Sequence, residues 1–403
     1  MIILGIETSC DETAIAIIEA NKGDNGLEPS FRVLGNALFS QIEIHKQYGG
    51  VFPIMAKREH AKNLTPILSR AMEEARNTLT FDARLPLPTA KEDEIKKLLE
   101  REDNLSAELI PFLNGIGKPH IDAIAITYGP GLEPALWVGI SFAIAIGLAW
   151  NIPLIPINHM EGHIVAALLK RDISSLENNE TEIVASEIVR FPLLALLVSG
   201  GHTELVIADN WLSYTVIGKT RDDAVGEAYD KAARILGLPY PGGPEIARLA
   251  EEARIANIQS PLTLPRPMIH SKDFDFSFSG LKTAVLYGVK KLGELSAEQK
   301  KGVAREFEEA VTDTLIGKTI KAIEQYAPDT IIIGGGVSAN TYLQKKMITA
   351  VGTLGAIKLL LPDRNLSTDN AIMIAIAGFI NLSHGEKTQD AGIPIRAQGN
   401  LKL

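Results

Sequence analysis

The sequence predicts an α/β protein of two domains, and three observations support this fold class. Runs rich in β-branched residues alternate with helical stretches along the chain. Three of these strand-like runs end in turns of small residues, as strands of α/β sheets often do. The length of 403 residues is more than one hydrophobic core usually serves, so two domains are expected.

The three strand-and-turn units are spread over the chain. The first strand, Ile2 to Glu7, is apolar until Glu7 and too short for a secretion signal, and it leads into the turn Thr8 to Thr13. The other strands are Leu193 to Val198, followed by Ser199-Gly-Gly-His202, and Thr330 to Ile333, followed by Gly334 to Gly336. The helices predicted between them are Glu59 to Thr78, Asp222 to Leu236, Gly243 to Asn257, Ala297 to Tyr326 and Asn370 to Ser383.

The stretch from Pro134 to Asn158 contains no charged residue and resembles a membrane span in composition. Asn151-Ile-Pro153 and Pro156 interrupt it after Trp150, which leaves too few residues to cross a bilayer. We therefore expect a buried helix, Gly139 to Trp150, followed by a short strand, Leu154 to Ile157.

Two segments have the composition of surface insertions. Residues 82–118 are charged, carry Pro86 and Pro88, and include an expected amphipathic helix from Lys91 to Glu102. Residues 172–189 are polar and acidic. Neither contains a recognisable motif, so both are interpreted as solvated elaborations.

Composition indicates a cytoplasmic protein. The only cysteine, Cys10, excludes an internal disulfide, and no signal peptide is recognisable. The net charge of −9 argues against binding nucleic acid through overall positive charge, although a local basic patch or a partner protein remains compatible with it. Two sets of residues are candidates for phosphate contacts: Lys57, Arg58 and Lys62, or Arg266 and Lys272.

A histidine pair, His159-Met-Glu-Gly-His163, follows the predicted strand Leu154 to Ile157. On a helix, residues four apart share one face, with Cβ atoms about 6 Å apart, so two imidazoles can bind one metal ion. The same spacing also occurs by chance. Its place after a strand, where α/β proteins bind ligands, favours the metal site.

Two acidic residues bear on this site. Glu161 lies two residues after His159, whereas the general base of H-E-x-x-H peptidases lies one residue after the first ligand, so a peptidase of that design is disfavoured. The best candidate for a third ligand is Asp369, at the start of a predicted helix. An N-cap role is the alternative for Asp369 and, from sequence alone, the preferred one.

Glycine-rich turns predict a phosphate site. Leu197-Val-Ser-Gly-Gly-His-Thr203 and Ile333 to Asn340 each join a strand to glycines whose amides can approach an anion, and Pro241-Gly-Gly-Pro244 adds a third turn. None matches the dinucleotide or P-loop patterns. Asp230, on a helix between these turns, can hold ribose hydroxyls or be simply a solvated charge.

The first turn, Thr8 to Thr13, is rich in hydroxyls and carboxylates. Asp11 and Glu12 suit a metal ion or a proton. Cys10 is not expected to act as a nucleophile, because no positive group near it in sequence would lower its pKa.

Together these motifs resemble one known family, the tRNA N(6)-adenosine threonylcarbamoyltransferases, bacterial TsaD and its archaeal and mitochondrial relatives. Seven motifs occur in the family's order, over nearly the whole chain outside the two insertions. They are Ile6-Glu-Thr-Ser-Cys-Asp-Glu-Thr13, His159-Met-Glu-Gly-His163, Leu197-Val-Ser-Gly-Gly-His-Thr203, Tyr240-Pro-Gly-Gly-Pro244, Asp275-Phe-Ser-Phe-Ser-Gly-Leu-Lys-Thr283, Gly335-Gly-Val-Ser-Ala-Asn340 and Thr368-Asp-Asn370.

The resemblance implies an actin-like (ASKHA) fold of two lobes with the substrate in the cleft between them. The first lobe would be residues 1–158, with 82–118 inserted, completed by 370–403, and the second would be 159–369. The implied metal ligands are His159, His163 and Asp369, with iron as Fe²⁺ expected and zinc as the alternative. The residues implied to bind the adenylate are Leu197, Val198, Ser199, Gly200, Gly201, Asp230, Gly243 and Asn340.

The implied reaction moves a threonylcarbamoyl group from threonylcarbamoyl-AMP to the exocyclic amine of the adenosine 3′ of the anticodon, in tRNAs reading codons that begin with adenine. AMP is released. Asp11 or Glu12 is the candidate that accepts the proton of the amine. Bacterial members of the family work with TsaB-type and TsaE-type proteins, and no membrane is involved.

The chain departs from the family pattern at four places. Asn158 stands where a histidine is common, Tyr229 where Phe is usual, and Glu133-Pro134 interrupts a small apolar stretch. Ile54 stands where many members carry Glu, which argues against a mechanism that needs a carboxylate there. The competing interpretations are a metallopeptidase, a sugar or acid kinase of the same superfamily, and a non-catalytic nucleotide-binding regulator.

Overall fold

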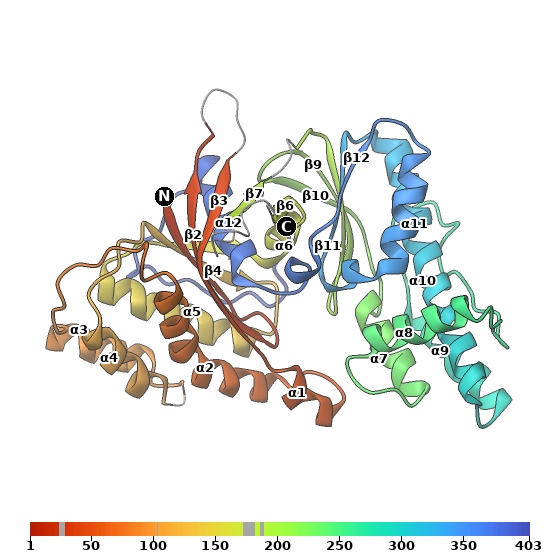
Figure 1. The fold of residues 1–403 in the computed structure, drawn as a ribbon, viewed down its shortest axis with the longest axis horizontal. Coiled ribbons are helices and arrows are strands. Elements are labelled where there is room, and N and C mark those ends of the chain that lie inside the picture. The colour runs from red at the N-terminus through yellow and green to blue at the C-terminus, as the bar shows by residue number, and fades with distance from the viewer. Residues whose placement is uncertain (24–28, 103, 172–181, 186–188) are drawn as a thin grey trace. The chain divides into compact units, whose positions relative to one another are not determined.

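The structure is a computed structural model that describes residues 1–23, 29–102, 104–171, 182–185 and 189–403. The chain divides into two compact units, each with its own sheet and core (Figure 1). Unit 1 comprises residues 1–45, 51–188 and 369–403, and unit 2 comprises 46–50 and 189–368.

Unit 1 is built on a mixed sheet in which, among the described residues, the strand order is β5-β4-β1-β2-β3-β7-β6. β1 is parallel to β4, and β4 to β5, whereas β1, β2, β3, β7 and β6 are successively antiparallel. The strands are β1 (Ile2–Glu7), β2 (Glu12–Asn21), β3 (Ser30–Ser40), β4 (Ala123–Gly129), β5 (Leu154–Asn158), β6 (Leu169–Arg171) and β7 (Glu182–Ala185).

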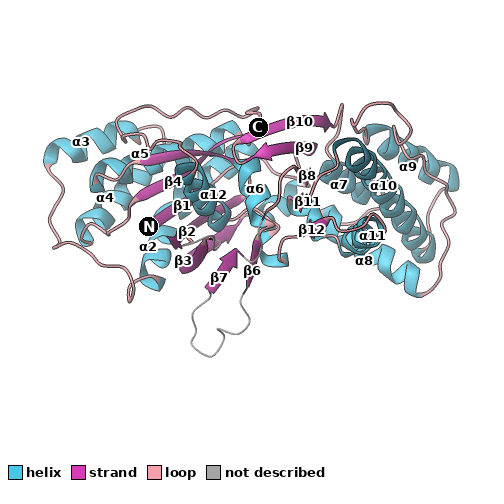
Figure 2. Ribbon diagram, turned by 90° about the horizontal axis from the view of Figure 1, so that it is seen from above, coloured by secondary structure: helices cyan, strands magenta, loops and turns pink. Residues whose placement is uncertain are grey.

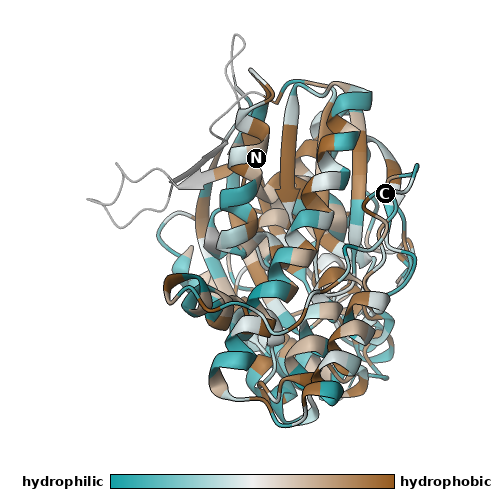
Figure 3. Cartoon of the chain, turned by 90° about the vertical axis from the view of Figure 1, so that its right-hand side faces the viewer, coloured by the Kyte–Doolittle hydropathy of each residue, from teal (hydrophilic) through white to brown (hydrophobic). Residues whose placement is uncertain are grey.

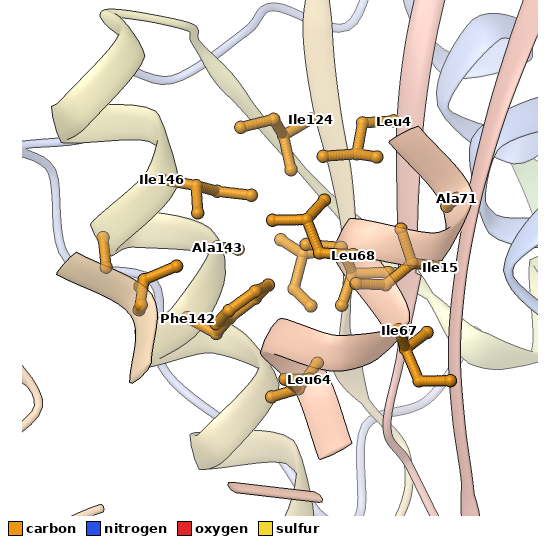
Figure 4. Packing of buried hydrophobic residues seen from close by; sticks show 14 of the residues in the cluster. Leu4, Ile15, Leu64, Ile67, Leu68, Ala71, Ile124, Phe142, Ala143 and Ile146 are labelled. Carbon is orange, nitrogen blue, oxygen red and sulfur yellow. The ribbon is translucent and has the colours of Figure 1, made fainter. Parts of the chain in front are cut away.

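Helices cover both faces of this sheet. The helices of unit 1 are α1 (Ile42–His45), α2 (Pro53–Glu74), α3 (Thr89–Leu98), α4 (Leu105–Gly115), α5 (Glu133–Trp150), α6 (His159–Ala166) and α12 (Ala371–Ser383). Helices α2 and α5 pack on one face, where Leu4, Leu68 and Phe142 belong to one core (Figure 4). Helix α12 packs against β1, β2 and β4, with Gly5 touching the backbone at Ala371. A Cβ at Gly5 would collide with that backbone, which explains glycine in the middle of a buried strand.

Unit 2 repeats the same sheet plan. Among its described residues the strand order is β10-β9-β8-β11-β12, with β8 antiparallel to β9 and parallel to β11. The strands are β8 (Leu193–Val198), β9 (Thr203–Asn210), β10 (Ser213–Lys219), β11 (Thr330–Gly334) and β12 (Lys358–Leu360). Strands β8 to β12 therefore match β1 to β5 one by one. This duplicated arrangement is the actin-like fold that was expected, although no repeat is visible in the sequence.

The helices of unit 2 pack around its sheet, as two views of the chain show (Figures 1 and 2). They are α7 (Val225–Ile235), α8 (Gly242–Ile255), α9 (Ser279–Leu292), α10 (Ala297–Tyr326) and α11 (Thr341–Gly352), with the 3-10 turns η3 (Gly336–Ala339) and η4 (Arg364–Leu366). Several helices carry hydrophilic residues on one side and hydrophobic residues on the other (Figure 3). This is the pattern of helices that bury one face only.

The domain boundary in the structure differs from the one expected. Residues 159–188, assigned to the second lobe by the sequence analysis, group with unit 1. Strand β5 pairs with β4, and α6, which follows it directly, packs against α12, so this part of the chain stays with the first sheet.

The two predicted insertions behave differently. Segment 82–118 is not a solvated elaboration: it forms α3 and α4, and Ile95, Leu105 and Leu109 are fully buried in the core of unit 1. Its polar composition reflects the outer faces of two amphipathic helices. Most of segment 172–189 lies outside the described residues, but residues 182–185 form β7, which pairs with β3 and β6.

Helix α5 includes the predicted buried helix and begins earlier, at Glu133. Among the described residues it alone has the length and apolar composition of a membrane span, and 67% of it is buried inside the structure. Its apolar surface is therefore accounted for by packing in the core of unit 1.

Candidate metal centre

The candidate metal centre lies where strands of the first sheet end. Because β1, β4 and β5 are parallel, their carboxyl ends meet at one edge. Strand β1 ends at Glu7, and β5 leads directly into α6, which begins with His159. Helix α12 contacts both β1 and α6, and Asp369 stands just before it. The fold thus brings together residues from three distant parts of the sequence.

His159, His163 and Asp369 form one cluster with a ligand atom from each within 4.8 Å of the others. Nε2 of His159 lies 3.4 Å from Oδ1 of Asp369, and Nε2 of His163 lies 3.3 Å from the same oxygen. Two ligand atoms about 2.1 Å from one ion, at a tetrahedral angle, are about 3.4 Å apart, so these separations fit a shared ion.

The burial of His163 supports the same conclusion. Its side chain is fully buried, and among the described residues Nδ1 has no hydrogen-bond partner, while Nε2 faces only Oδ1 of Asp369 at 3.3 Å without the geometry of a hydrogen bond. Leaving a buried polar atom without a partner is costly, and such atoms are rare in native proteins. A metal ion bound to Nε2 would remove that cost. The cluster is therefore compatible with a single metal ion.

Asp369 is not the helix cap that its position suggests. The side chain of the next residue, Asn370, accepts a hydrogen bond from the Met373 amide and caps α12. The carboxylate of Asp369 is therefore free of the capping role. Its pKa is well below the usual range: burial raises it, but His159 and then His163 lower it more.

Glu7 is a functional residue that the sequence reasoning missed. Its fully buried carboxylate approaches Nδ1 of His159 to 3.2 Å, and it accepts hydrogen bonds from the Thr127 hydroxyl and the Ser9 amide, both at 2.5 Å. Burial raises the pKa of Glu7, but the neighbouring His159 offsets this and the net pKa is lowered. A carboxylate on Nδ1 fixes the ring so that Nε2 faces the metal position. The sequence feature that could have pointed to Glu7 is a charged residue at the end of an otherwise apolar strand.

The two carboxylates beside His159 shift the pKa of its ring. Burial alone would lower the pKa of its ring, but Asp369 and then Glu7 raise it well above the ordinary value. A buried carboxylate, Glu7, and a partly buried one, Asp369, therefore favour a positive charge at this place, and a bound cation would satisfy the same field.

Glu161 lies away from these ligands, as its position in the helix predicts. Its Oε2 accepts a hydrogen bond from Asn381 of α12 at 3.3 Å, and burial raises its pKa to about 7. A carboxylate held there cannot serve as the base of a peptidase centred on His159 and His163, so this alternative loses its main support.

The acidic turn lies between β1 and β2. Asp11 is buried, and the Glu12 carboxylate accepts a hydrogen bond from the Ser40 hydroxyl at 3.1 Å. Burial, followed by the charge of Asp11, raises the pKa of Glu12 well above its usual value. Burial and the same Asp11 also raise the pKa of the Cys10 thiol. The thiol is therefore protonated at neutral pH, in agreement with the prediction that Cys10 is not a nucleophile.

In unit 2 the predicted glycine turns lie side by side. Because β8 and β11 are parallel neighbours, the turns that follow them share one edge, and Gly335, at φ +89°, touches the backbone of Val198. Leu197 and Val198 are fully buried, backbone included, so they support the turn from within the sheet. A Cβ placed on Gly200, Gly201 or Gly243 would meet no atom within 4 Å, which leaves open space beside these backbones.

Helix α7 links the remaining predicted residues. The amide of Gly226 donates to the Ser199 carbonyl at 3.2 Å, and Asp230 accepts from the Gly242 amide at 2.7 Å, next to Gly243. Helix α7 also contacts η3, which precedes Asn340. The predicted adenylate residues thus surround one helix. Asp230 is half-buried and holds a turn, so it is not a simple solvated charge.

Asn340 is already engaged by the protein. Its Oδ1 caps α11 through the Leu343 amide at 2.8 Å, and its Nδ2 donates to the buried carboxylate of Glu308 at 2.6 Å. Arg254 pairs with Glu308 at 2.6 Å and covers the ring of Tyr342 at 3.5 Å. These contacts hold the turn after β11 in place.

The candidate phosphate contacts fall into two groups. Lys57 pairs with Glu102 at 3.2 Å, and Arg266 pairs with Glu306 at 2.6 Å and with Asp313 at 3.0 Å. These side chains are occupied within the protein. Arg58, Lys62 and Lys272 are exposed, and Lys62 lies 3.8 Å from the carboxylate of Glu59 on the same helix.

Comparison with known proteins shows the family of this chain. The family model described as TsaD, tRNA N6-adenosine threonylcarbamoyltransferase, matches residues 32–83 and 113–376. The chain belongs to this family. A curated tRNA N6-adenosine threonylcarbamoyltransferase of Nitrosospira multiformis is 38% identical over 96% of this chain and 92% of its own length. The enzyme of Thermosipho melanesiensis is 41% identical over 94% of this chain and 94% of its own length. That of Bacillus cereus is 40% identical over 96% of this chain and 93% of its own length.

Two solved structures have a distant similarity to this chain. A full-length HypF in its phosphate- and nucleotide-bound form has a TM-score of 0.48 at 12% identity, covering 71% of this chain and 42% of that one. A ROK hexokinase from Thermus thermophilus has a TM-score of 0.39 at 13% identity, covering 96% of this chain and all of that one.

The departures from the TsaD-family pattern have structural roles. Glu133 and Pro134 are the first two residues of α5, where an acid and a proline favour helix initiation. Tyr229 is buried with its ring edge-on to Phe307. Ile54 lies near the start of α2 and is 58% exposed, and as an isoleucine it supplies no carboxylate there.

Proposed function

We propose that this TsaD-family protein transfers the threonylcarbamoyl group of threonylcarbamoyl-AMP to the exocyclic amine of the adenosine 3′ of the anticodon, releasing AMP. The tRNA acceptors would be those reading codons that begin with adenine. The observation that carries the proposal is the buried His159–His163–Asp369 cluster in a chain of this family. Such a donor set suits a metal beside an activated substrate.

The metal would be held by His159, His163 and Asp369, with Glu7 holding the first ring in place. Two imidazoles and one carboxylate suit Fe²⁺, which we expect, and also Zn²⁺. When bound, the ion supplies Lewis-acid chemistry that polarises a carbonyl or balances charge on a phosphate. The protein keeps His163 buried and free of competing hydrogen bonds, so the ring is available to the ion.

The adenylate would be held by unit 2. Backbone amides of Gly200 and Gly201 can approach the phosphate, because open space surrounds the two glycines. The Ser199 amide donates to the His202 carbonyl at 2.9 Å, so Ser199 would contribute through its hydroxyl. Asp230, beside Gly243, would accept the ribose hydroxyls, and the turn at Asn340 would complete the site. Leu197 and Val198 would contribute by holding the glycine turn in place, since both residues are fully buried.

The chemistry needs no covalent nucleophile, because an acyl adenylate is already activated. The acceptor is an aromatic amine, a weak nucleophile, so the protein must position it and accept its proton. We assign the proton to Asp11 or Glu12. Burial and the neighbouring Asp11 raise the pKa of Glu12, which makes its ionised carboxylate a stronger base toward the proton of the amine.

The proposed partners are those that the family resemblance implies, and the charge of the chain supports a need for them. A net charge of −9 is unfavourable for binding tRNA, and Lys57 and Arg266 are already paired, so TsaB-type and TsaE-type proteins would assist. An unpaired anticodon-loop base can leave its stack at little cost. We place the reaction in the cytoplasm.

The test is a transfer assay. Purified protein, threonylcarbamoyl-AMP labelled in the threonyl group and unmodified tRNA are incubated with and without the partner proteins. Label in the tRNA, at the adenosine 3′ of the anticodon, with equimolar AMP, is the expected result. Absence of label in tRNA under both conditions contradicts the proposal, and ATP-dependent phosphorylation of a sugar or acid would favour the kinase alternative.

A further inference from the structure

Asn158 contacts two parts of unit 1 that are far apart in sequence. Its Oδ1 accepts a hydrogen bond from the Met160 amide at 2.9 Å and so caps α6. Its Nδ2 donates to the carbonyl of Lys402 at 3.0 Å. The residue is 8% exposed, so both bonds are shielded from water. One side chain therefore ties the metal-binding helix to the segment 398–402.

The same segment also contacts the loop after β4. The Gln398 amide donates to the Tyr128 carbonyl at 2.8 Å, and Gly399 accepts from the Gly131 amide at 3.1 Å. A Cβ on Gly129 would collide with the Gln398 carbonyl, so the two backbones are in close contact. Segment 398–402 thus lies against the loop 129–132.

That loop leads back to the metal ligands. The Leu132 amide donates to the carbonyl of Ser9 at 2.7 Å, and the Ser9 hydroxyl lies 3.3 Å from Nδ1 of His159. Segment 398–402 is therefore connected to His159 from two sides, through Asn158 and through the loop 129–132 and Ser9.

Helix α6 depends on such contacts because it is short. It has eight residues, and both histidine ligands fall within its first five. A helix of this length is not stable alone, so its position is set by tertiary contacts and by its cap.

We propose that Asn158 is a positioning residue for the metal ligands, and that it acts by joining segment 398–402 to the first turn of α6. The inference rests on the proposed metal binding and adds a part of the chain to it. The segment lies beyond residue 376, where the match to the family model ends.

The test separates the two bonds of Asn158. Asn158→Ser keeps a neutral oxygen that can cap α6 but is too short to reach Lys402, and deletion of residues 398–403 removes the acceptor. The dissociation constant for Zn²⁺ is measured by competition with a chromophoric chelator for each variant and for the double variant. Each single change is expected to weaken Zn²⁺ binding roughly tenfold, and the double variant no more than the stronger single one. Ser296→Ala, which removes the cap of α10 in unit 2, is the matched control and should leave the constant within about twofold.

Amide exchange in the metal-free protein gives the second readout. Asn158→Ser is expected to speed amide exchange in both 398–402 and α6. Ser296→Ala is expected to lower the thermal midpoint of unfolding, and Asn158→Ser is not. Any one of three results would overturn the proposal. The first is a Zn²⁺ dissociation constant of the single variants within about twofold of that of the unaltered protein, and the second is a double variant in which the two losses of Zn²⁺ affinity multiply. The third is unchanged amide exchange in α6. Failure of the unaltered protein to bind Zn²⁺ would contradict the proposed metal centre instead, and the exchange measurement would still decide the role of Asn158.

Discussion

The carboxylate of Glu7 lies 3.2 Å from Nδ1 of His159, on the side of the ring away from Asp369. Glu7 ends the first strand and His159 begins α6, so parallel pairing of β1, β4 and β5 places them together. The pair fixes the ring before any ion binds. Holding a ligand in this way increases metal affinity.

Glu7→Gln is therefore expected to weaken metal binding by about 10- to 100-fold, because an amide cannot hold the ring as a carboxylate does. The measurement is a titration of the metal-free protein with Zn²⁺. Glu161→Gln is the control: it changes a buried carboxylate on the other side of the same helix and should leave the affinity nearly unchanged. Equal effects from both variants would mean that Glu7 acts only through overall charge.

His60 predicts a dependence of stability on acid. Its ring contacts the Thr13 hydroxyl at 2.8 Å and the Cys10 carbonyl at 3.0 Å, and burial lowers its pKa to about 4. Between this value and the ordinary value of about 6.5 the unfolded chain binds a proton and the folded chain does not, so stability is lost as the pH falls. The loss reaches about 3 kcal/mol.

Urea unfolding at pH 7 and pH 4.5 measures this contribution. His60→Gln lacks the titrating group, so its stability should fall less over this interval than that of the unaltered protein, although it is less stable at pH 7. The same fall in both proteins would show that other groups account for the acid sensitivity.

The buried pair of Arg254 and Glu308 predicts a large effect in unit 2. Arg254→Ala leaves the carboxylate of Glu308, 1% exposed, without its cation and is expected to cost about 3–5 kcal/mol. Adding Glu308→Gln should recover part of this, because a neutral amide needs no cation. Since Glu308 also accepts from Asn340, AMP binding should weaken in Arg254→Ala. Unfolding free energies and AMP titration of the two variants are the measurements, and a double variant less stable than Arg254→Ala would contradict this reasoning.

Gly5 predicts a packing effect that reaches the metal. A Cβ there would collide with the Ala371 backbone of α12, whose first residues follow Asp369. Gly5→Ala should therefore lower both stability and Zn²⁺ affinity, by about 1–3 kcal/mol in stability. Gly115→Ala, where a Cβ meets no atom within 4 Å, is the control for the substitution itself. Unaltered Zn²⁺ affinity in Gly5→Ala would show that α12 shifts without moving Asp369.

The strands beginning at Ile2 and Leu193 could be predicted because continuous apolar runs are typical of fully buried strands. The place of segment 82–118 in the core could not be predicted, because its charged residues lie on the outer faces of α3 and α4 while Ile95 and Leu105 are buried. A count of charges does not reveal which side of a helix they occupy.

The site was predictable in part, for a related reason. His159 and His163 could be paired because helical spacing is local. Asp369 and Glu7 belong to the same cluster but lie far away in sequence, and only the sheet and α12 bring them near. The resemblance nominated Asp369, whereas local patterns favoured an N-cap that the structure gives to Asn370.

The central claim is that a metal on the histidine pair supports transfer to tRNA. The most direct measurement is single-turnover transfer from threonylcarbamoyl-AMP by the variant His159→Ala/His163→Ala, together with its bound metal and its binding of AMP. We expect loss of the metal and loss of transfer, with AMP binding retained because the glycine turns lie in unit 2. Transfer at the rate of the unaltered protein by a metal-free variant would contradict it.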